Sequence, residues 1–128
     1  MKILLLVSAF NGLTQRVWCH LQDGGHDVGV ELAPTFDTPE ALTAAVEKID
    51  PDLILAPFLK HRVPREVWDR WTTVVVHPGP VGDRGPSSLD HAIRDGRDRW
   101  GVTALSAVEE MDAGPVWATS TFAMPSPP

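Results

Sequence analysis

The stretch MKILLLVSAF, residues 1–10, decides the fold class of this chain. Its apolar run from Ile3 to Ala9 is of the kind that forms a strand buried on both faces of a parallel sheet, and it is too short for a buried helix. Polar residues follow at once in NGLTQR, so the run is also too short to span a bilayer or to act as a signal sequence. The sequence therefore predicts an internal strand near the N-terminus.

Further apolar runs alternate with amphipathic segments along the rest of the chain. The predicted strands after the first are DVGVEL (27–32), DLILAPF (52–58), TTVVVHP (72–78), GVTALSAV (101–108) and VWATSTF (116–122). The predicted helices span 11–23, 39–49, 64–71 and 87–96, and their end signals are Gly24 and Gly25, the cap Thr38 before Pro39, Pro64, the Ser87/Asp90 pair and Gly96. This rhythm predicts an α/β fold with a doubly wound, mostly parallel sheet.

Composition limits the domain count and the partners. With 128 residues, 43% of them hydrophobic, the chain can form one core, which we assign to residues 1–122, and the proline-rich residues 123–128 are predicted to be a tail or truncated linker. Seventeen acidic against 11 basic residues give a net charge of -6, which disfavours nucleic acid. A single cysteine, Cys19, excludes an internal disulfide and is predicted to be a small packed thiol. We expect a cytoplasmic protein without a membrane partner.

Sequence motifs exclude several ligand classes. There is no G-x-G-x-x-G pattern and no G-x-x-x-x-G-K-[ST] loop, so dinucleotides and nucleoside triphosphates are disfavoured. The histidines at 20, 26, 61 and 91 have no partner at metal-binding spacing, and we predict no metal.

His77 is the first candidate catalytic residue. It follows the strand-forming residues 74–76 and precedes Pro78 and Gly79, which end the strand abruptly. From this segment alone, a proton-transferring histidine and a polar residue that merely ends a strand are equally supported. As a residue at an open strand end, it is expected to have little apolar contact, so that its replacement would barely change folding.

Asp112 lies in a second turn, DAG, after the next predicted strand. Because open α/β sheets bind ligands beyond the carboxyl ends of their strands, we expect His77 and Asp112 to converge on one cleft. A carboxylate beside an imidazole favours its charged form and fixes its orientation, as proton transfer requires.

Three strings in order carry a family resemblance. VVVHPG, GDRGPSSLDHAIRDG and GVTALSAVEEMDAG resemble the formyltransferases that use N10-formyltetrahydrofolate, among them the methionyl-tRNA and glycinamide ribonucleotide formyltransferases. SAFNGLTQR, PDLILAPFLKHRVP and HPGPVGDRGPSSLD are similar to the N-terminal formyltransferase-like domain of hydrogenase maturation factors. The similarity extends to about residue 122 and implies a Rossmann-like formyltransferase architecture.

The resemblance implies that His77 and Asp112 are catalytic. Val75 occupies the position of the family's asparagine, whose amide stabilises negative charge on the formyl oxygen. Either His77, backbone amides or a nearby group such as Arg84 replaces that amide, or the ordinary formylation of amines is lost.

Folate-binding residues follow from the resemblance and from charge. The family holds the pterin largely by main-chain groups after the third strand and in the aspartate turn, and the basic segment LKHRVPRE, with Lys60, Arg62 and Arg65, suits the anionic glutamate of folate. A solvated loop is the alternative for these basic residues, and an Asp83–Arg84 pair that orders the loop is the alternative for GDRG. The predicted substrate-binding residues are Phe58, Leu59, Arg62, Gly79, Asp83, Arg84, Glu110 and Met111.

These features predict transfer or release of the formyl unit of N10-formyltetrahydrofolate through a tetrahedral intermediate. The resemblance further implies a crotonase-like partner domain that makes carbon monoxide for a nickel–iron hydrogenase, with coenzyme A as an acceptor. Two alternatives stay open: a formyltetrahydrofolate hydrolase, and a non-catalytic folate-binding or interaction module in which Val75 marks a decayed site.

Overall fold

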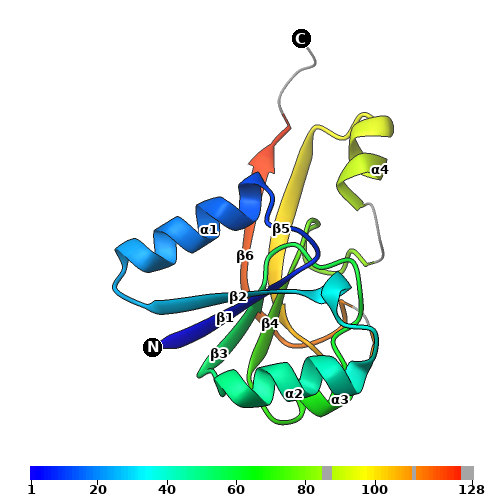
Figure 1. The fold of residues 1–128 in the computed structure, drawn as a ribbon. Coiled ribbons are helices and arrows are strands. Elements are labelled where there is room, and N and C mark those ends of the chain that lie inside the picture. The colour runs from blue at the N-terminus through cyan, green and yellow to red at the C-terminus, as the bar shows by residue number, and fades with distance from the viewer. Residues whose placement is uncertain (85–87, 111, 125–128) are drawn as a thin grey trace.

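The structure, a computed structural model, describes residues 1–84, 88–110 and 112–124 and contains one six-stranded mixed sheet with helices on both faces (Figure 1). The elements in chain order are β1 (Lys2–Val7), α1 (Gly12–Asp23), β2 (Asp27–Leu32), a 3-10 turn (Ala33–Thr35), α2 (Pro39–Ile49), β3 (Leu53–Ala56), α3 (Arg65–Trp68), β4 (Thr73–His77), α4 (Ser88–Arg94), β5 (Arg99–Ser106) and β6 (Val116–Ala123). The strand order across the sheet is β2-β1-β3-β4-β5-β6.

Strand β1 is the centre of the core, as its apolar run predicts. Residues 3–7 are all buried, and they alternate between the two faces of the sheet. On one face, Ile3, Leu5 and Val7 pack with Val28 of β2 and with side chains of α1. Helix α1 therefore covers this face of the sheet.

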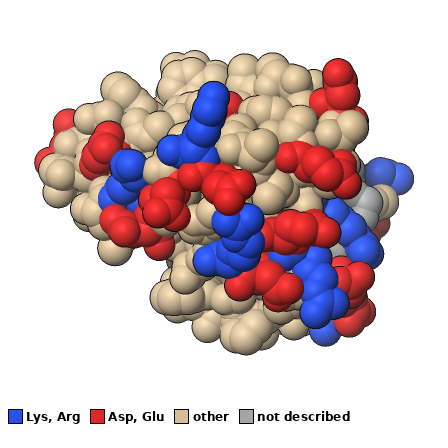
Figure 2. Space-filling view, turned by 60° about the horizontal axis from the view of Figure 1, so that its bottom comes forward, with Lys and Arg blue, Asp and Glu red and all other residues tan. Residues whose placement is uncertain are grey.

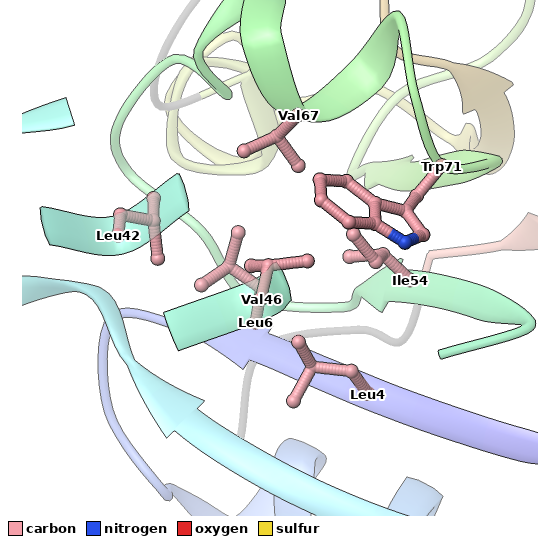
Figure 3. Packing of buried hydrophobic residues seen from close by; sticks show 7 residues of the cluster. All are labelled: Leu4, Leu6, Leu42, Val46, Ile54, Val67 and Trp71. Carbon is pink, nitrogen blue, oxygen red and sulfur yellow. The ribbon is translucent and has the colours of Figure 1, made fainter. Parts of the chain in front are cut away.

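The opposite face carries the larger apolar cluster, which is covered by α2 and α3. Figure 3 shows how these side chains meet between the sheet and the helices; they are Leu4, Leu6, Leu42, Val46, Ile54, Val67 and Trp71. A strand buried on both faces thus joins two cores in one domain.

Local signals in the sequence set the helix ends. Asn11 caps α1 by accepting a hydrogen bond from the Thr14 N–H, and Thr38 caps α2 with Pro39 in the first position. Gly96 follows α4 with a φ of 68°, in the left-handed region that glycine enters without strain.

Some boundaries and one burial prediction differ from the structure. Helix α3 and strand β3 are shorter than their patterns predict, and Ser87 of the predicted capping pair lies outside the described residues. Cys19 is exposed on α1, so the prediction of a packed thiol is wrong. Strand β6 ends at Ala123, the first residue of the predicted tail. Residues 125–128 of that tail lie outside the described part of the chain.

The prediction of a doubly wound sheet is wrong for its second half. Strands β2, β1, β3 and β4 are parallel, but β5 is antiparallel to β4, and β6 is antiparallel to β5. A parallel crossover needs a connection that returns along the length of the strand. Helix α4 has seven residues, about 10 Å of helix at ~1.5 Å per residue, and lies beside the start of β5 (Figure 1). Strand β5 therefore begins at the end of the sheet where β4 finishes, and it runs antiparallel to β4.

None of the helices in the described ranges is both long and apolar enough to cross a membrane.

The central position of β1 predicts a large cost for shortening one of its side chains. Leu4 is fully buried in the larger cluster, so Leu4→Ala should lower the free energy of unfolding by about 2–5 kcal/mol. Urea unfolding followed by circular dichroism measures this change. Leu13→Ala, at an exposed position of α1, is the matched control and should cost less than about 1 kcal/mol. Equal losses in the two variants would contradict the central role of β1.

Candidate functional site

His77 is the last residue of β4, and its side chain points toward the face that α2 and α3 cover. Thr73 lies opposite Ile54 of that core, and alternation along β4 puts Val75 and His77 on the same side. His77 is only 3% exposed. The expectation of an open strand end with little to lose on substitution is therefore wrong.

Asp112 contacts Nδ1, the inner ring nitrogen of His77. The distance from His77 Nδ1 to Asp112 Oδ2 is 3.3 Å, and the aspartate side chain is 12% exposed. The two residues do not meet as neighbouring carboxyl ends of parallel strands, because Ser106 at the end of β5 lies opposite Val74, at the other end of β4. The loop 107–115 has to run back to bring Asp112 to His77.

Two backbone features shape this returning loop. Asp112 has a φ of 59°, a left-handed conformation that aspartate tolerates better than most residues. At Gly114 a Cβ atom would overlap the backbone carbonyl of Ser106, so the loop passes too close to β5 for any side chain there. Both positions favour the residue that the sequence supplies.

Asp83 contacts Nε2, the outer ring nitrogen of His77, and the sequence did not predict this contact. The distance from His77 Nε2 to Asp83 Oδ2 is 2.7 Å, and the Ser88 hydroxyl lies 3.4 Å from the same nitrogen. Gly79 permits this approach, because a Cβ atom there would collide with the Asp83 carboxylate and come within 2.7 Å of His77 Nε2. The only sequence signal was a carboxylate in a glycine-rich loop after the strand.

Both ring nitrogens of His77 thus face a carboxylate. A neutral imidazole can donate from only one nitrogen, whereas an imidazolium donates from both. Burial raises the pKa of Asp83, but hydrogen bonds from Ser88 and His77 and the positive charges of His77 and Arg97 outweigh it, so the pKa is below its ordinary value. The arrangement suits a buried cation between two anions.

Strand β5 holds the loop that follows His77. The Trp100 indole N–H donates to the Pro78 carbonyl at 2.7 Å, and the Thr103 hydroxyl donates to the Gly79 carbonyl at 2.8 Å. Thr103 lies directly opposite His77 in the antiparallel register. These two hydrogen bonds hold the loop to β5 just before and just after the Gly79 Cα atom, where the absence of a side chain makes room for Asp83.

Arg84 joins the two loops at their exposed rim. Its Nη1 lies 2.9 Å from Glu110 Oε1, so Arg84 pairs with the aspartate turn and not with Asp83. Both side chains are largely exposed, so this ion pair contributes little stability. Met111, the other predicted binding residue in this turn, lies outside the described residues.

Leu59 and Arg62 line a separate cavity of about 240 Å³, whose lining includes neither His77 nor Asp112. Leu6 and Leu42 contribute to its apolar wall, and Thr38 and His61 lie among its polar residues. Leu6 belongs to the α2/α3 face, so the cavity and the His77 side chain lie on the same side of the sheet. The structure divides the predicted site into two parts.

The basic side chains of residues 59–66, near this cavity, make more contacts with the protein than the sequence indicates. The Lys60 ammonium lies 5.5 Å from the centre of the Phe58 ring, and the Phe58 carbonyl accepts a hydrogen bond from the Ser8 N–H. Arg65 pairs with Asp69 within the α3 region. Figure 2 shows acidic and basic side chains interleaved on the molecule's lower face rather than gathered by sign.

Val75 faces the same side as His77 and carries no hydrogen-bonding group, so it supplies no amide donor. Within the described ranges, no group of three or more histidine, cysteine or carboxylate side chains is arranged to hold a metal ion.

Two long proteins are similar to nearly all of this chain. The hydrogenase maturation factor HoxX of Bradyrhizobium diazoefficiens is 48% identical over 124 residues, which is 97% of this chain and 21% of HoxX. The crystal structure of HypX from Aquifex aeolicus in complex with tetrahydrofolic acid superposes with a TM-score of 0.92 at 51% identity, covering 98% of this chain and 22% of HypX. The chain thus spans about a fifth of the length of these relatives.

A smaller enzyme shares the fold. Phosphoribosylglycinamide formyltransferase from Bacillus halodurans superposes with a TM-score of 0.77 at 16% identity, over 98% of this chain and 81% of the enzyme. The mixed sheet is therefore that of a formyltransferase fold. No protein-family model matches the sequence.

The lowered pKa of Asp83 predicts how its stabilising effect depends on pH. A carboxyl with a lower pKa in the folded chain stabilises folding above its ordinary value of 3.8, and this contribution is lost as the pH falls through the folded value. The difference in unfolding free energy between wild type and Asp83→Asn should therefore shrink from about pH 5 to about pH 2. Urea unfolding at a series of pH values measures it. A difference that grows in acid would show that Asp83 is not stabilised as a carboxylate.

Proposed function

We propose that this chain, which is similar over nearly its whole length to HoxX and to HypX, a protein crystallised with tetrahydrofolic acid, binds N10-formyltetrahydrofolate and transfers or releases the formyl group. The observation that carries this proposal is the buried histidine between two carboxylates, at the end of the parallel part of a formyltransferase fold. The sequence resemblance assigns catalytic roles to His77 and Asp112, and their contact supports this assignment.

Formyl transfer needs one proton to change places. The acceptor atom forms a bond to the formyl carbon and loses its hydrogen as a proton, the bond from that carbon to N10 breaks, and N10 keeps the electron pair and gains a proton. A histidine that both accepts and donates protons suits this exchange, and a carboxylate on its inner nitrogen keeps the ring oriented and favours its charged form. We assign proton transfer to the His77 centre and orientation to Asp112.

The folate is proposed to bind on the face of the sheet that carries both the His77 cluster and the cavity. In this proposal the pterin lies against main-chain groups around Phe58 and Leu59 and in the aspartate turn at Glu110, and Arg62 faces an anionic group. Met111 is assigned to the same site from the sequence alone. Gly79, Asp83 and Arg84 border the reacting end. The position of the cavity and of His77 on one face of the sheet supports a ligand that reaches both.

The acceptor and the wider role are part of the proposal. We propose that the formyl unit serves hydrogenase maturation, with a crotonase-like domain as partner, coenzyme A as one acceptor and the cytoplasm as location. The name of HoxX supports the first point, and the four fifths of that protein outside this region leave room for the second. Water as acceptor would make the reaction a hydrolysis.

Val75 favours one alternative, a folate-binding module without catalysis. A valine offers no donor to a developing oxyanion, and loss of one such donor costs an acyl-transfer enzyme about a hundredfold or more in rate. A chain of this kind would bind tetrahydrofolate but release none from the formylated form.

Replacement of His77 tests catalysis. His77→Gln should lower the rate of tetrahydrofolate release from N10-formyltetrahydrofolate about a hundredfold. Because His77 is buried between two carboxylates, the variant should also lose about 1–3 kcal/mol of stability. Absorbance of the released tetrahydrofolate, with and without coenzyme A, measures the rate, and calorimetry with tetrahydrofolate measures binding.

The control is His20→Gln, at an exposed position of α1, which should keep full activity. Unchanged release by a folded His77→Gln chain would exclude the catalytic proposal. Binding without release by the wild-type chain would instead favour the binding module.

Replacement of Val75 tests the departure from the family pattern. Val75→Asn supplies an amide on the face that His77 shares, and it should raise formyl transfer to a primary amine relative to both wild type and Val75→Ala. The strand should still form, because Val75 is only half-buried. Chromatography of the formylated amine measures the product, and no gain over Val75→Ala would show that the site lacks another part.

A further inference from the structure

We propose that Asp83, and not His77, is the group of this centre that meets the acceptor and takes its proton. The inference rests on the proposed function and names the residue through which the His77 centre reaches its substrate. The working unit is then a line of three groups, Asp83, His77 and Asp112, in place of a histidine–aspartate pair.

Accessibility orders the three side chains. His77 is 3% exposed, Asp112 is 12% exposed and Asp83 is 28% exposed. Both nitrogens of the imidazole already face carboxylates, at 2.7 Å and 3.3 Å. An acceptor that approaches from solvent therefore encounters the Asp83 carboxylate before it can reach a ring nitrogen.

The contact between Asp83 and His77 is built into the fold. Ser88 hydrogen-bonds the Asp83 carboxylate, and the Asp83 N–H donates to the Pro80 carbonyl at 3.0 Å. Gly79 leaves the space that the carboxylate occupies, and Thr103 of β5 fixes the Gly79 carbonyl. The hydrogen bond from Ser88, the backbone bond to Pro80 and the space at Gly79 together hold the Asp83 side chain against Nε2.

Asp83 carries the negative charge that a proton acceptor needs. Its pKa lies below the ordinary value because the hydrogen bonds and positive charges around it outweigh burial, so it is ionised at neutral pH. His77 between the two carboxylates balances part of their charge. The nearby Arg84 is engaged by Glu110 at 2.9 Å and does not pair with Asp83.

The proton balance closes without a co-reactant. As the acceptor atom bonds to the formyl carbon, its proton moves to an oxygen of Asp83, which becomes a carboxylic acid. When the bond from carbon to N10 breaks, N10 takes the electron pair, and the same proton passes to N10. His77 keeps its own proton and its 2.7 Å hydrogen bond to Asp83 through both steps, and the carboxylate is restored at the end.

The test compares three variants of the whole chain in the tetrahydrofolate-release assay. Asp83→Asn keeps the shape but cannot accept a proton, and kcat/KM should fall about a hundredfold. Asp83→Ala should fall as far and should regain activity in proportion to added acetate, which fits the vacated space and carries the missing carboxylate. Asp69→Asn, an exposed carboxylate beside Arg65 on the α3 side, is the control and should keep full activity and show no response to acetate.

Gly79→Ala should displace the Asp83 carboxylate without changing its chemistry. The added methyl group would occupy the place of the Asp83 oxygen, so activity should fall although both His77 and Asp83 are present. Activity of Asp83→Asn within threefold of wild type, or an Asp83→Ala chain that is folded, inactive and insensitive to acetate, would overturn the proton role.

A nuclear magnetic resonance measurement separates this inference from the proposed function, because it needs no turnover. Asp83→Ala removes the hydrogen-bond partner of Nε2, so the nitrogen-15 signal of His77 Nε2 should move between wild type and Asp83→Ala, whereas Asp69→Asn should leave it in place. Identical Nε2 signals in wild type and Asp83→Ala would show that Asp83 does not hold His77. If wild type releases no tetrahydrofolate, the proposed function and the proton route both fail, and the Nε2 signal still decides the contact.

Discussion

The antiparallel pairing of β5 with β4 is the constraint on which the candidate site depends. It puts Thr103 opposite His77, and from there β5 holds the carbonyls of Pro78 and Gly79. The same direction carries the end of β5 away from His77, so the following loop has to return along the sheet before Asp112 can reach the imidazole. A fully parallel sheet would have provided neither the anchors nor this loop.

Electrostatics and burial then act together at His77. A buried charge is costly unless it is paired and hydrogen-bonded, and here each ring nitrogen has a carboxylate partner. The two carboxylates differ in what else they touch: Asp112 sits in a tight turn against β5, while Asp83 lies in a loop that is more exposed. This asymmetry gives the centre a more buried side at Asp112 and a more exposed side at Asp83.

The parallel half of the sheet provides the other part of the proposed site. There the carboxyl ends of β1 and β3 border a cavity with an apolar wall and with Arg62 among its polar residues, on the same face as His77. Open α/β sheets bind ligands at such ends, which supports one proposed site that includes both regions. Val75 lies on this face without a hydrogen-bond donor, so the proposed chemistry would depend on other groups.

The sequence by itself determined the order and type of the elements, because apolar runs, caps and glycine stops act within a few residues of one another. It also singled out His77 and Asp112, and their contact is present in the structure. Tertiary structure alone decided the direction of β5 and β6, the burial of His77, the Asp83 contact and the separation of Leu59 and Arg62 from the histidine. The physical reason is that a strand's apolar pattern is much the same for parallel and antiparallel neighbours, whereas strand direction decides which distant loops meet.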